Sequence, residues 1–524
     1  MKRAKRQVGI TKRNFVHQSN NFGKILTVAV LFLAVVNASA IQLTDLYDFT
    51  LADWGPGPLI LSGNILYGTS PTGNTNQNAA GADGTGAIWR LNTDGTGFQE
   101  LYSFSADPFG TNSDGANLFG GVVLSSSNTL YGVAFIGGAS GLGTIFSINT
   151  NRTGFINLHN FSGADGNGPY GKLLLSSNTL YGTTVFGGDH GLSGTVFKIN
   201  NDGTGFTNLH NFTSIGDSNT NIDGFEPYAG LVLSSNVLYG TASGGGLGGG
   251  DINFGSGTIF KINTDGTSFQ VLHHFSAALL SGPSIYTNNE GAAPQEIILA
   301  GNALYGVTVN AGAYGNGTLF RINTDGTGFT KLHDFDGIEP SDKILLSGDV
   351  IYGVASGTIY RINTNGTGFI NLYDNSSNAV IDVVLSGQTF YGTGSYGTNG
   401  WGMIFSLGPS QPIINSIVLN TDGTVTISCS GDAGFAYLMQ ATTNLGLLAS
   451  WQTVSTNTAD TNGNWQFTDY SLTNTIYGCF TNLIYTNVDI DPGSTNQPIL
   501  IGTNTWCGDV LATLTRFYRA ATVP

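Results

Sequence analysis

Short apolar runs separated by turn-forming residues recur along most of this chain. Residues 169–213 show one unit: KLLLSS is an apolar run, TLYGTTVF is rich in β-branched and aromatic residues, TVFKIN alternates between two faces, and FTNLHNF follows an NDGTG turn. Runs of this length bounded by Gly, Asn, Asp and Ser predict strands, and Asp-Gly predicts a tight hairpin. Each unit is therefore expected to form four antiparallel strands, as in the blade of a β-propeller.

A Tyr-Gly pair marks each unit and gives the count. It occurs seven times, at Tyr67, Tyr131, Tyr181, Tyr239, Tyr305, Tyr352 and Tyr391. A third strand follows each pair, at 87–92, 144–149, 195–200, 258–263, 318–323, 358–363 and 403–407. The last unit lacks a fourth strand, whereas LYDFT at 46–50 precedes the first unit.

We therefore predict an all-β protein with a seven-bladed β-propeller of four-stranded blades over residues 41–407. The N-terminal strand would complete the last blade. The ring needs this closure because each blade buries its faces only against its neighbours. An open array, or a different number of blades, is the alternative.

The repeat resembles two known families. The order of its elements is similar to the NHL-type propeller blade, and LYGTT, GTVFKIN and LHNF together resemble the GloVer tandem repeat of secreted proteins from Verrucomicrobia and Gloeobacter. The resemblance covers roughly residues 43–407. It implies a propeller, and it transfers no activity and no catalytic residue.

The repeat pattern stops at residue 407. GPSQP at 408–412 is expected to be a linker. Four motifs in 413–524 resemble the C-terminal β-sandwich module of secreted Verrucomicrobial proteins: Tyr437 to Leu445, Trp451 to Asn457, Gly463 to Asp469, and Arg516 to Arg519. The resemblance implies an immunoglobulin- or fibronectin-like sandwich of unknown role, with an insertion at about 474–513.

The first forty residues have the pattern of a secretory signal peptide. A basic start precedes the apolar stretch ILTVAVLFLAVV at 25–36, and Ala38-Ser39-Ala40 follows as a cleavage signal. An uncleaved anchor is the alternative, but this stretch is shorter than the roughly twenty residues that span a bilayer. We expect cleavage after Ala40, no membrane span in the mature chain, and a location outside the cell or in the cell envelope.

Charge narrows the possible partners. The mature chain would carry 11 Lys and Arg against 33 Asp and Glu, because seven basic residues precede residue 25. An acidic surface repels phosphate backbones, so we predict no nucleic-acid partner. We expect a monomer with a glycan or protein ligand.

The three cysteines are expected to play structural roles. Cys479 and Cys507 lie in the predicted insertion, and in an exported protein such a pair is expected to form a disulfide. Strand alternation places Cys429 with Val425 and Ile427, which predicts a buried free thiol. An alternative or intermolecular pairing stays open. The spacing makes no zinc site, and we predict neither a metal nor a cofactor.

Most histidines repeat with the units, which argues against catalysis. His159, His210, His273 and His333 share one place in the fourth strand, where other units have Tyr47, Tyr102 and Tyr373. A position that accepts His or Tyr in successive units predicts packing or edge hydrogen bonding. Five cations likewise share one place in the third strand: Arg90, Lys198, Lys261, Arg321 and Arg361. We predict no catalytic residue.

The two ends of the propeller differ in their loops. One end has short, uniform turns, whereas the other has long, dissimilar connections such as 69–86, 214–229 and 277–293. Loops on a rigid scaffold commonly carry binding surfaces, and aromatic rings beside polar groups suit sugars or protein side chains. The candidate ligand-binding residues at this long-loop end are Trp54, Tyr170, Phe225, Tyr228, Tyr286, Tyr314, Tyr396 and Trp401. Local loop packing is the alternative for any one of them.

These features favour a secreted, non-catalytic binding or surface-interaction protein. A propeller-type carbohydrate-active enzyme, either a glycosidase or a polysaccharide lyase, is an alternative because acidic residues abound. A glycosidase needs two carboxylates that face each other. A lyase would need a base together with a cation, and the loops lack Lys and Arg. A purely structural envelope component is the third possibility.

Overall fold

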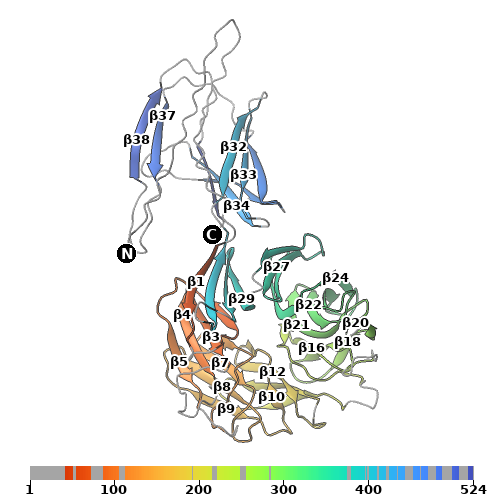
Figure 1. Ribbon diagram of the computed structural model, residues 1–524. Coiled ribbons are helices and arrows are strands. Elements are labelled where there is room, and N and C mark those ends of the chain that lie inside the picture. The colour runs from red at the N-terminus through yellow and green to blue at the C-terminus, as the bar shows by residue number, and fades with distance from the viewer. Residues whose placement is uncertain are drawn as a thin grey trace.

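The computed structural model describes residues 42–522 except 51–54, 72–85, 106–111, 192, 215–220, 248–254, 283–284, 375–378, 396, 398–399, 410–411, 421–423, 433–434, 443–451, 461, 470–479, 487–498 and 507–516. Every regular element among these residues is a β-strand. Figure 1 shows the strands grouped into small sheets that follow one another round a ring. The all-β prediction is confirmed.

Seven antiparallel sheets form the blades; six run outward in chain order, and the seventh has the N-terminal strand as its outermost strand. Blades 1 to 3 comprise β2 (Leu59–Ser62), β3 (Ile65–Ser70), β4 (Ala87–Asn92) and β5 (Gln99–Ser103); β6 (Val122–Leu124), β7 (Thr129–Ala134), β8 (Thr144–Asn149) and β9 (Ile156–Asn160); and β10 (Asn167–Pro169), β11 (Leu174–Ser176), β12 (Thr179–Phe186), β13 (Thr195–Asn200) and β14 (Thr207–Asn211). In blade 3 the innermost strand is split into β10 and β11.

Blades 4 to 7 repeat this arrangement. They comprise β15 (Val232–Ser234), β16 (Val237–Ala242), β17 (Thr258–Asn263) and β18 (Gln270–His274); β21 (Ala292–Ala300), β22 (Ala303–Asn310), β23 (Thr318–Asn323) and β24 (Thr330–Asp334); β25 (Pro340–Ser347), β26 (Val350–Ala355), β27 (Thr358–Asn363) and β28 (Ile370–Tyr373); and β29 (Val380–Ser386), β30 (Thr389–Gly394), β31 (Met403–Gly408) and β1 (Gln42–Asp48). Six third strands begin and end where the sequence predicts, and β31 extends one residue further.

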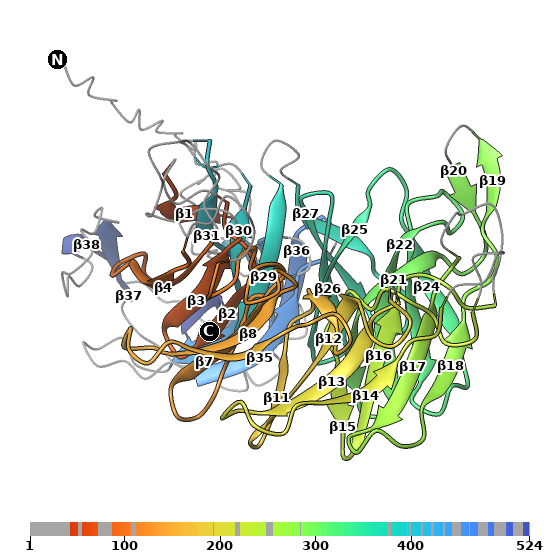
Figure 2. The same ribbon diagram turned by 90° about the horizontal axis from the view of Figure 1, so that it is seen from below.

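The ring closes through the N-terminal strand, as predicted. β1 pairs antiparallel with β31, from Gln42 opposite Gly408 to Asp48 opposite Met403. Figure 2 shows β1, β31, β30 and β29 side by side. Hydrogen bonds also join blade 7 to blade 1: the Leu59 amide donates to Asp382 Oδ2 over 2.8 Å, and Thr393 Oγ1 donates to the Gly57 carbonyl over 3.1 Å.

Packing explains the Tyr-Gly pair. In each blade the glycine lies against the aromatic ring that the third strand carries at one position: Trp89, Phe146, Phe197, Phe260, Phe320, Tyr360 or Phe405. A Cβ on Gly132, Gly182, Gly240 or Gly306 would stand 2.5 Å from the facing ring. The rings are buried, so they have no room to move aside.

Packing also accounts for the repeated histidines. The His159 ring stacks on Phe206 of the next blade at 3.8 Å, and its Nε2 lies 2.9 Å from Asp165 Oδ2. Tyr102 fills the same place in blade 1, stacking on Phe155 at 3.9 Å and donating to Asp114 Oδ2 over 2.9 Å. The prediction of packing and hydrogen bonding at this position is confirmed.

The C-terminal part contains two three-stranded sheets and a separate hairpin. One sheet has the order β32 (Ile413–Leu419), β33 (Val425–Ser430), β36 (Asn464–Asp469), and the other β35 (Gln452–Thr458), β34 (Ala436–Thr442), β39 (Phe517–Thr522). The hairpin pairs β37 (Phe480–Thr486) with β38 (Ile499–Trp506), within the predicted insertion. The linker at 408–412 and the immunoglobulin-like type stay predictions.

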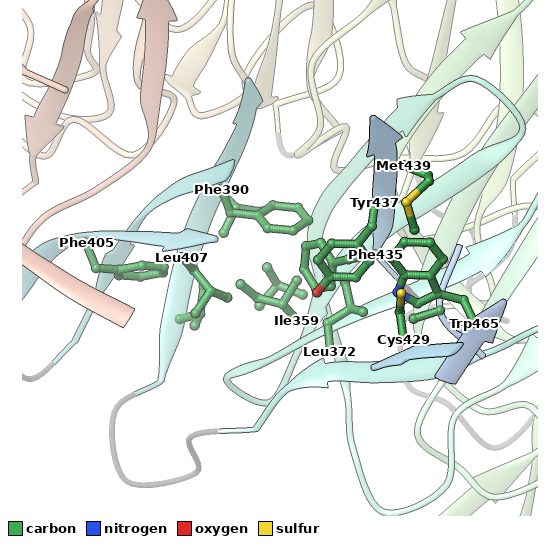
Figure 3. Packing of buried hydrophobic residues seen from close by; sticks show 14 of the residues in the cluster. Ile359, Leu372, Phe390, Phe405, Leu407, Cys429, Phe435, Tyr437, Met439 and Trp465 are labelled. Carbon is green, nitrogen blue, oxygen red and sulfur yellow. The ribbon is translucent and has the colours of Figure 1, made fainter. Parts of the chain in front are cut away.

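One apolar cluster contains residues from both parts of the chain. Figure 3 shows Phe390 and Leu407 of blade 7 with Tyr437 and Trp465 of the C-terminal sheets. Cys429 is buried in the same cluster as a free thiol, as predicted. β32 follows β31 after a few residues, so the C-terminal sheets adjoin the end of the propeller where β1 begins.

Several predicted features lie outside the described residues: the signal peptide, Trp54, Tyr396, Cys479 and Cys507. In the part of the chain that the structure describes, no helix is long and apolar enough to cross a membrane.

Candidate functional site

The innermost strand of each blade lines the axis of the ring and begins at the long-loop end. Contacts between β2 and β29, β2 and β6, β15 and β21, β21 and β25, and β25 and β29 identify these strands as the inner ones. Their first residues follow the long connections directly. Side chains at their starts therefore surround the mouth of the central channel.

An aromatic arc crosses this mouth on three consecutive blades. Phe119 and Tyr228 stand just before the inner strands of blades 2 and 4, and Tyr170 lies between β10 and β11 of blade 3. The Phe119 and Tyr170 rings stack at 5.2 Å, and the Tyr170 and Tyr228 rings meet edge to face at 5.4 Å. Phe135 supports Tyr170 from the side at 5.9 Å. The packing fixes the two tyrosines while part of each stays exposed.

A cavity of about 320 Å³ opens beside the arc. Tyr170, Tyr228, Gln295 and Val309 line it, so blades 3, 4 and 5 all contribute. The Gln295 side chain is held by its Nε2, which donates to Ser243 Oγ over 3.2 Å. The backbone carbonyl of Gln295 accepts a 2.7 Å bond from Thr241 Oγ1. The cavity thus presents two aromatic rings and one oriented amide.

Of the six predicted aromatic residues that the structure describes, only Tyr170 and Tyr228 line this cavity. Phe225 is 1 % exposed and packs against Gly244, so its side chain does not line the cavity. Tyr286 packs on a small alanine cluster, and Trp401 packs at the junction of blades 7 and 1. Tyr314 is 54 % exposed and lies apart from the cavity.

Tyr286 belongs to an additional hairpin of the long-loop end, β19 (Leu279–Gly282) with β20 (Ile285–Thr287). Figure 2 shows it projecting beyond blade 5. Its Leu279, Leu280 and Ile285 are exposed.

A layer of charged residues lies one step deeper in the channel, and the sequence did not indicate it. Registers place Ile297, Ile344 and Val383 opposite the glycines of their Tyr-Gly pairs. The residue just before each of these is charged: Glu296, Lys343 and Asp382. Lys172 holds the same position in blade 3, because Leu174 pairs with Tyr181. Gly121 and Gly230 take this position in blades 2 and 4.

The four charges face one space across the ring. Lys343 Nζ lies 3.8 Å from Glu296 Oε2 and 3.9 Å from Asp382 Oδ1. Burial lowers the pKa of Lys172, and the positive charge of Lys343 lowers it further, while Asp382 and Glu296 oppose this effect. Lys172 makes no ion pair with any residue that the structure describes. We call Lys172, Glu296, Lys343 and Asp382 the channel layer.

Two groups beside the cavity have shifted pKa values. Burial raises the pKa of the Glu226 carboxyl. Burial also raises the pKa of Tyr228, and the charge of Glu226 adds to that shift. Both groups therefore favour their neutral forms, which suits a site that hydrogen-bonds an uncharged part of a ligand.

Comparison with known proteins concerns the repeat and the fold. Residues 78–285 match the model of the Gloeobacter/Verrucomicrobia repeat. The chain carries this repeat. No curated protein matches this chain.

Solved structures similar to this repeat protein include the extracellular domain of a candidate one-component system from B. thetaiotaomicron. It shows 11% identity and a TM-score of 0.45, over 85% of this chain and 55% of that one. An oligogalacturonate lyase in complex with manganese shows 11% identity and a TM-score of 0.45, over 71% and 94%. An oligogalacturonate lyase from Vibrio parahaemolyticus shows 10% and 0.44, over 71% and 98%.

Proposed function

We propose that this chain is a secreted binding protein that holds a glycan at the mouth of its propeller channel. The observation that carries the proposal is the cavity lined by Tyr170, Tyr228, Gln295 and Val309. Its volume of about 320 Å³ lies at the lower end of the range typical of small-ligand sites. The site belongs to the long-loop end, as the loop pattern led us to expect.

The chemistry of the lining suits a sugar. The apolar face of a sugar ring stacks on an aromatic ring, and its hydroxyls pair with amide and phenol groups. Tyr170 and Tyr228 meet at 89°, so they offer two surfaces at a right angle. Gln295 presents an amide whose position is fixed by Ser243. A protein side chain could use the same groups, and that is the alternative ligand.

Export fits this proposal. The expected signal peptide, the low content of charged residues and the acidic balance suit a protein outside the cell. The C-terminal sheets adjoin the end of the propeller where β1 begins, which is opposite the long-loop end. We propose that the C-terminal part serves attachment or spacing.

The test is glycan binding by residues 41–524, measured on a glycan array and by calorimetry, with calcium and with chelator. Tyr170→Ala and Tyr228→Ala should each weaken binding at least tenfold. Tyr314→Ala is the matched control, since Tyr314 is exposed on the same end but lies outside the cavity. Glycan binding that survives both cavity substitutions would move the site elsewhere, and no glycan binding at all would favour a protein ligand.

Enzymatic turnover is the second candidate, favoured by one observation. Burial raises the pKa of Glu226, and a carboxyl held toward its protonated form is what a general acid requires. Bound glycans should therefore be checked for cleavage products by chromatography. Product formation that is lost in Glu226→Gln while binding persists would establish an enzyme, and intact ligand after prolonged incubation would leave binding as the function.

A further inference from the structure

We propose that the bound glycan is acidic, and that Lys172 in the channel layer receives its carboxylate. This inference rests on the proposed function and names the ligand class of the same site. It depends on the unequal ion pairing in the channel layer and on the position of Lys172, two residues after Tyr170 of the cavity.

The close ion pairs of the channel layer involve only one of its two lysines, Lys343. Lys343 lies between the carboxylates of Glu296 and Asp382, at 3.8 and 3.9 Å. Asp382 also accepts the Leu59 amide, so its second oxygen is engaged. Lys172 has no such partner among the described residues. Buried charges in proteins are normally paired, and a channel cation without a partner is therefore suited to an anion that arrives with the ligand.

The geometry connects Lys172 to the cavity. Lys172 follows Tyr170 by two residues on the inner edge of blade 3. Its carbonyl oxygen lies 2.8 Å from where a Cβ on Gly230 would stand, and Gly230 follows Tyr228 by two residues. On blade 5, Glu296 directly follows Gln295. The channel layer is thus one layer below the groups that line the cavity.

The two tyrosines and Lys172 together would recognise two features of a ligand. Tyr170 and Tyr228 accept the apolar faces of sugar rings, and an ammonium below them accepts a carboxylate with a charge-assisted hydrogen bond. Neutral sugars satisfy the first requirement alone. A uronic acid, or another sugar that carries a carboxylate, satisfies both.

Because the surface as a whole is acidic, selectivity for an anionic ligand depends on Lys172. The mature chain would carry 33 acidic residues against 11 basic ones, so an anionic ligand is repelled by most of the molecule. Five of those basic residues share one place in the third strands, away from the inner edge. Selectivity for an acidic glycan must therefore come from Lys172 and not from the surface as a whole.

The test compares a uronic-acid oligosaccharide with its methyl ester, titrated by calorimetry into residues 41–524. The unmodified protein should bind the acid at least tenfold more tightly than the ester. Lys172→Gln should lose that tenfold preference and bind the ester within twofold of the unmodified protein. Lys172→Arg should restore the preference. Lys331→Gln is the control for removing one positive charge, because Lys331 lies on the outer strand β24 and pairs with Asp334 at 2.7 Å.

The outcomes separate the two proposals. Equal affinity for acid and ester in the unmodified protein, with loss of both in Tyr170→Ala, would overturn the role of Lys172 and keep glycan binding. An equal loss of both ligands in Lys172→Gln would do the same, provided that the variant melts like the parent. Binding of neither ligand by the unmodified protein would overturn glycan binding itself.

The pH dependence gives a readout that a structural role would not produce. Burial and Lys343 lower the pKa of Lys172, whereas Glu296 and Asp382 oppose them. As the pH rises, the ammonium should therefore lose its proton at a pH below the ordinary lysine value of 10.5, and the preference for the acid should be lost with it. Lys172→Arg should keep its preference across the same range, because an arginine stays charged. Identical pH profiles for the two proteins would overturn the proposal.

Discussion

Gly182 lies directly over the ring of Phe197, and a Cβ at that position would stand 2.5 Å from Cζ of Phe197 and 2.9 Å from Leu173 Cδ2. Gly182→Ala should therefore lower the free energy of unfolding by about 1 to 3 kcal/mol, since both neighbours are buried. Urea unfolding measures the loss. Gly408→Ala is the control, because its Cβ would lie 3.4 Å from Thr389 Oγ1, an ordinary contact. Equal stability of the two variants would contradict this account of the Tyr-Gly pair.

The stacked histidines should make stability sensitive to acid. Burial lowers the pKa of His159 below its ordinary value of 6.5, and Asp165 only partly offsets this. The unfolded chain then binds more protons near that value, so stability is full above about pH 6.5 and falls as the pH drops toward the folded pKa.

His159→Tyr should reduce this acid sensitivity by an amount on the order of 1 kcal/mol at most, because Tyr fills the same place in blade 1. Thermal melts between pH 7.5 and pH 5 measure it. His190→Tyr serves as the control, since His190 is an exposed loop residue. A variant that loses as much stability in acid as the parent would show that other groups control the acid response.

Lys172 should lower the folding stability of the ligand-free protein. Its pKa is lowered mainly by burial, so at neutral pH the charged ammonium opposes folding, and the stability deficit shrinks as the pH rises through the folded pKa. Lys172→Met should stabilise the empty protein by an amount on the order of 1 kcal/mol at pH 7. The gain should narrow toward pH 10. A melting temperature below that of the parent at pH 7 would mean that Lys172 supports the fold.

Ring closure should depend on β1. Starting the chain at residue 51 would remove β1 and Phe49, which is fully buried and lies 5.9 Å from Trp89. The edge of β31 would then be unpaired, and open strand edges promote association. Size-exclusion chromatography should show aggregates or a loss of soluble protein, whereas a chain starting at Ile41 should elute as a monomer. A soluble, cooperatively melting ring without β1 would refute the closure.

Thiol counting tests both cysteine predictions. Burial raises the pKa of Cys429 to about 12, so its thiol stays protonated and unreactive in the folded protein. An aromatic disulfide reagent should therefore detect no thiol in the native protein and one after unfolding without reductant. After reduction it should detect three. Three thiols in the unfolded, unreduced protein would show that Cys479 and Cys507 are not bonded.

The blades could be predicted from the sequence because each motif that marks a strand or a turn spans only a few residues. The Tyr-Gly pair, the third strand and the Asp-Gly turn recur in a fixed order, and packing of Gly182 on Phe197 shows why. The packing role of the stacked histidines could be predicted from the same repetition. Even the missing fourth strand was detectable, since a spare strand stood at the other end of the chain.

The site could be predicted only in part because it depends on register. Phe225 and Tyr228 are three residues apart in one loop, yet one is buried and the other lines the cavity. Lys172, Glu296, Lys343 and Asp382 belong to four blades, and each stands beside an apolar run where a charge is unremarkable in isolation. Aligning every unit on its Tyr-Gly pair, and comparing the residue just before the one that faces the glycine, would have revealed the layer.

The pairing of Gln42 with Gly408 sets the order in which this protein can become complete. During synthesis β1 emerges first, whereas its partner β31 emerges only after six other blades. β1 therefore stays without its partner strand while the other blades form one after another. Cooperative stability arrives with the last blade, and until then the growing chain has an open edge at each end. A chaperone that shields β1 would act over most of this period, and shortening the wait by circular permutation should speed folding without altering the finished ring.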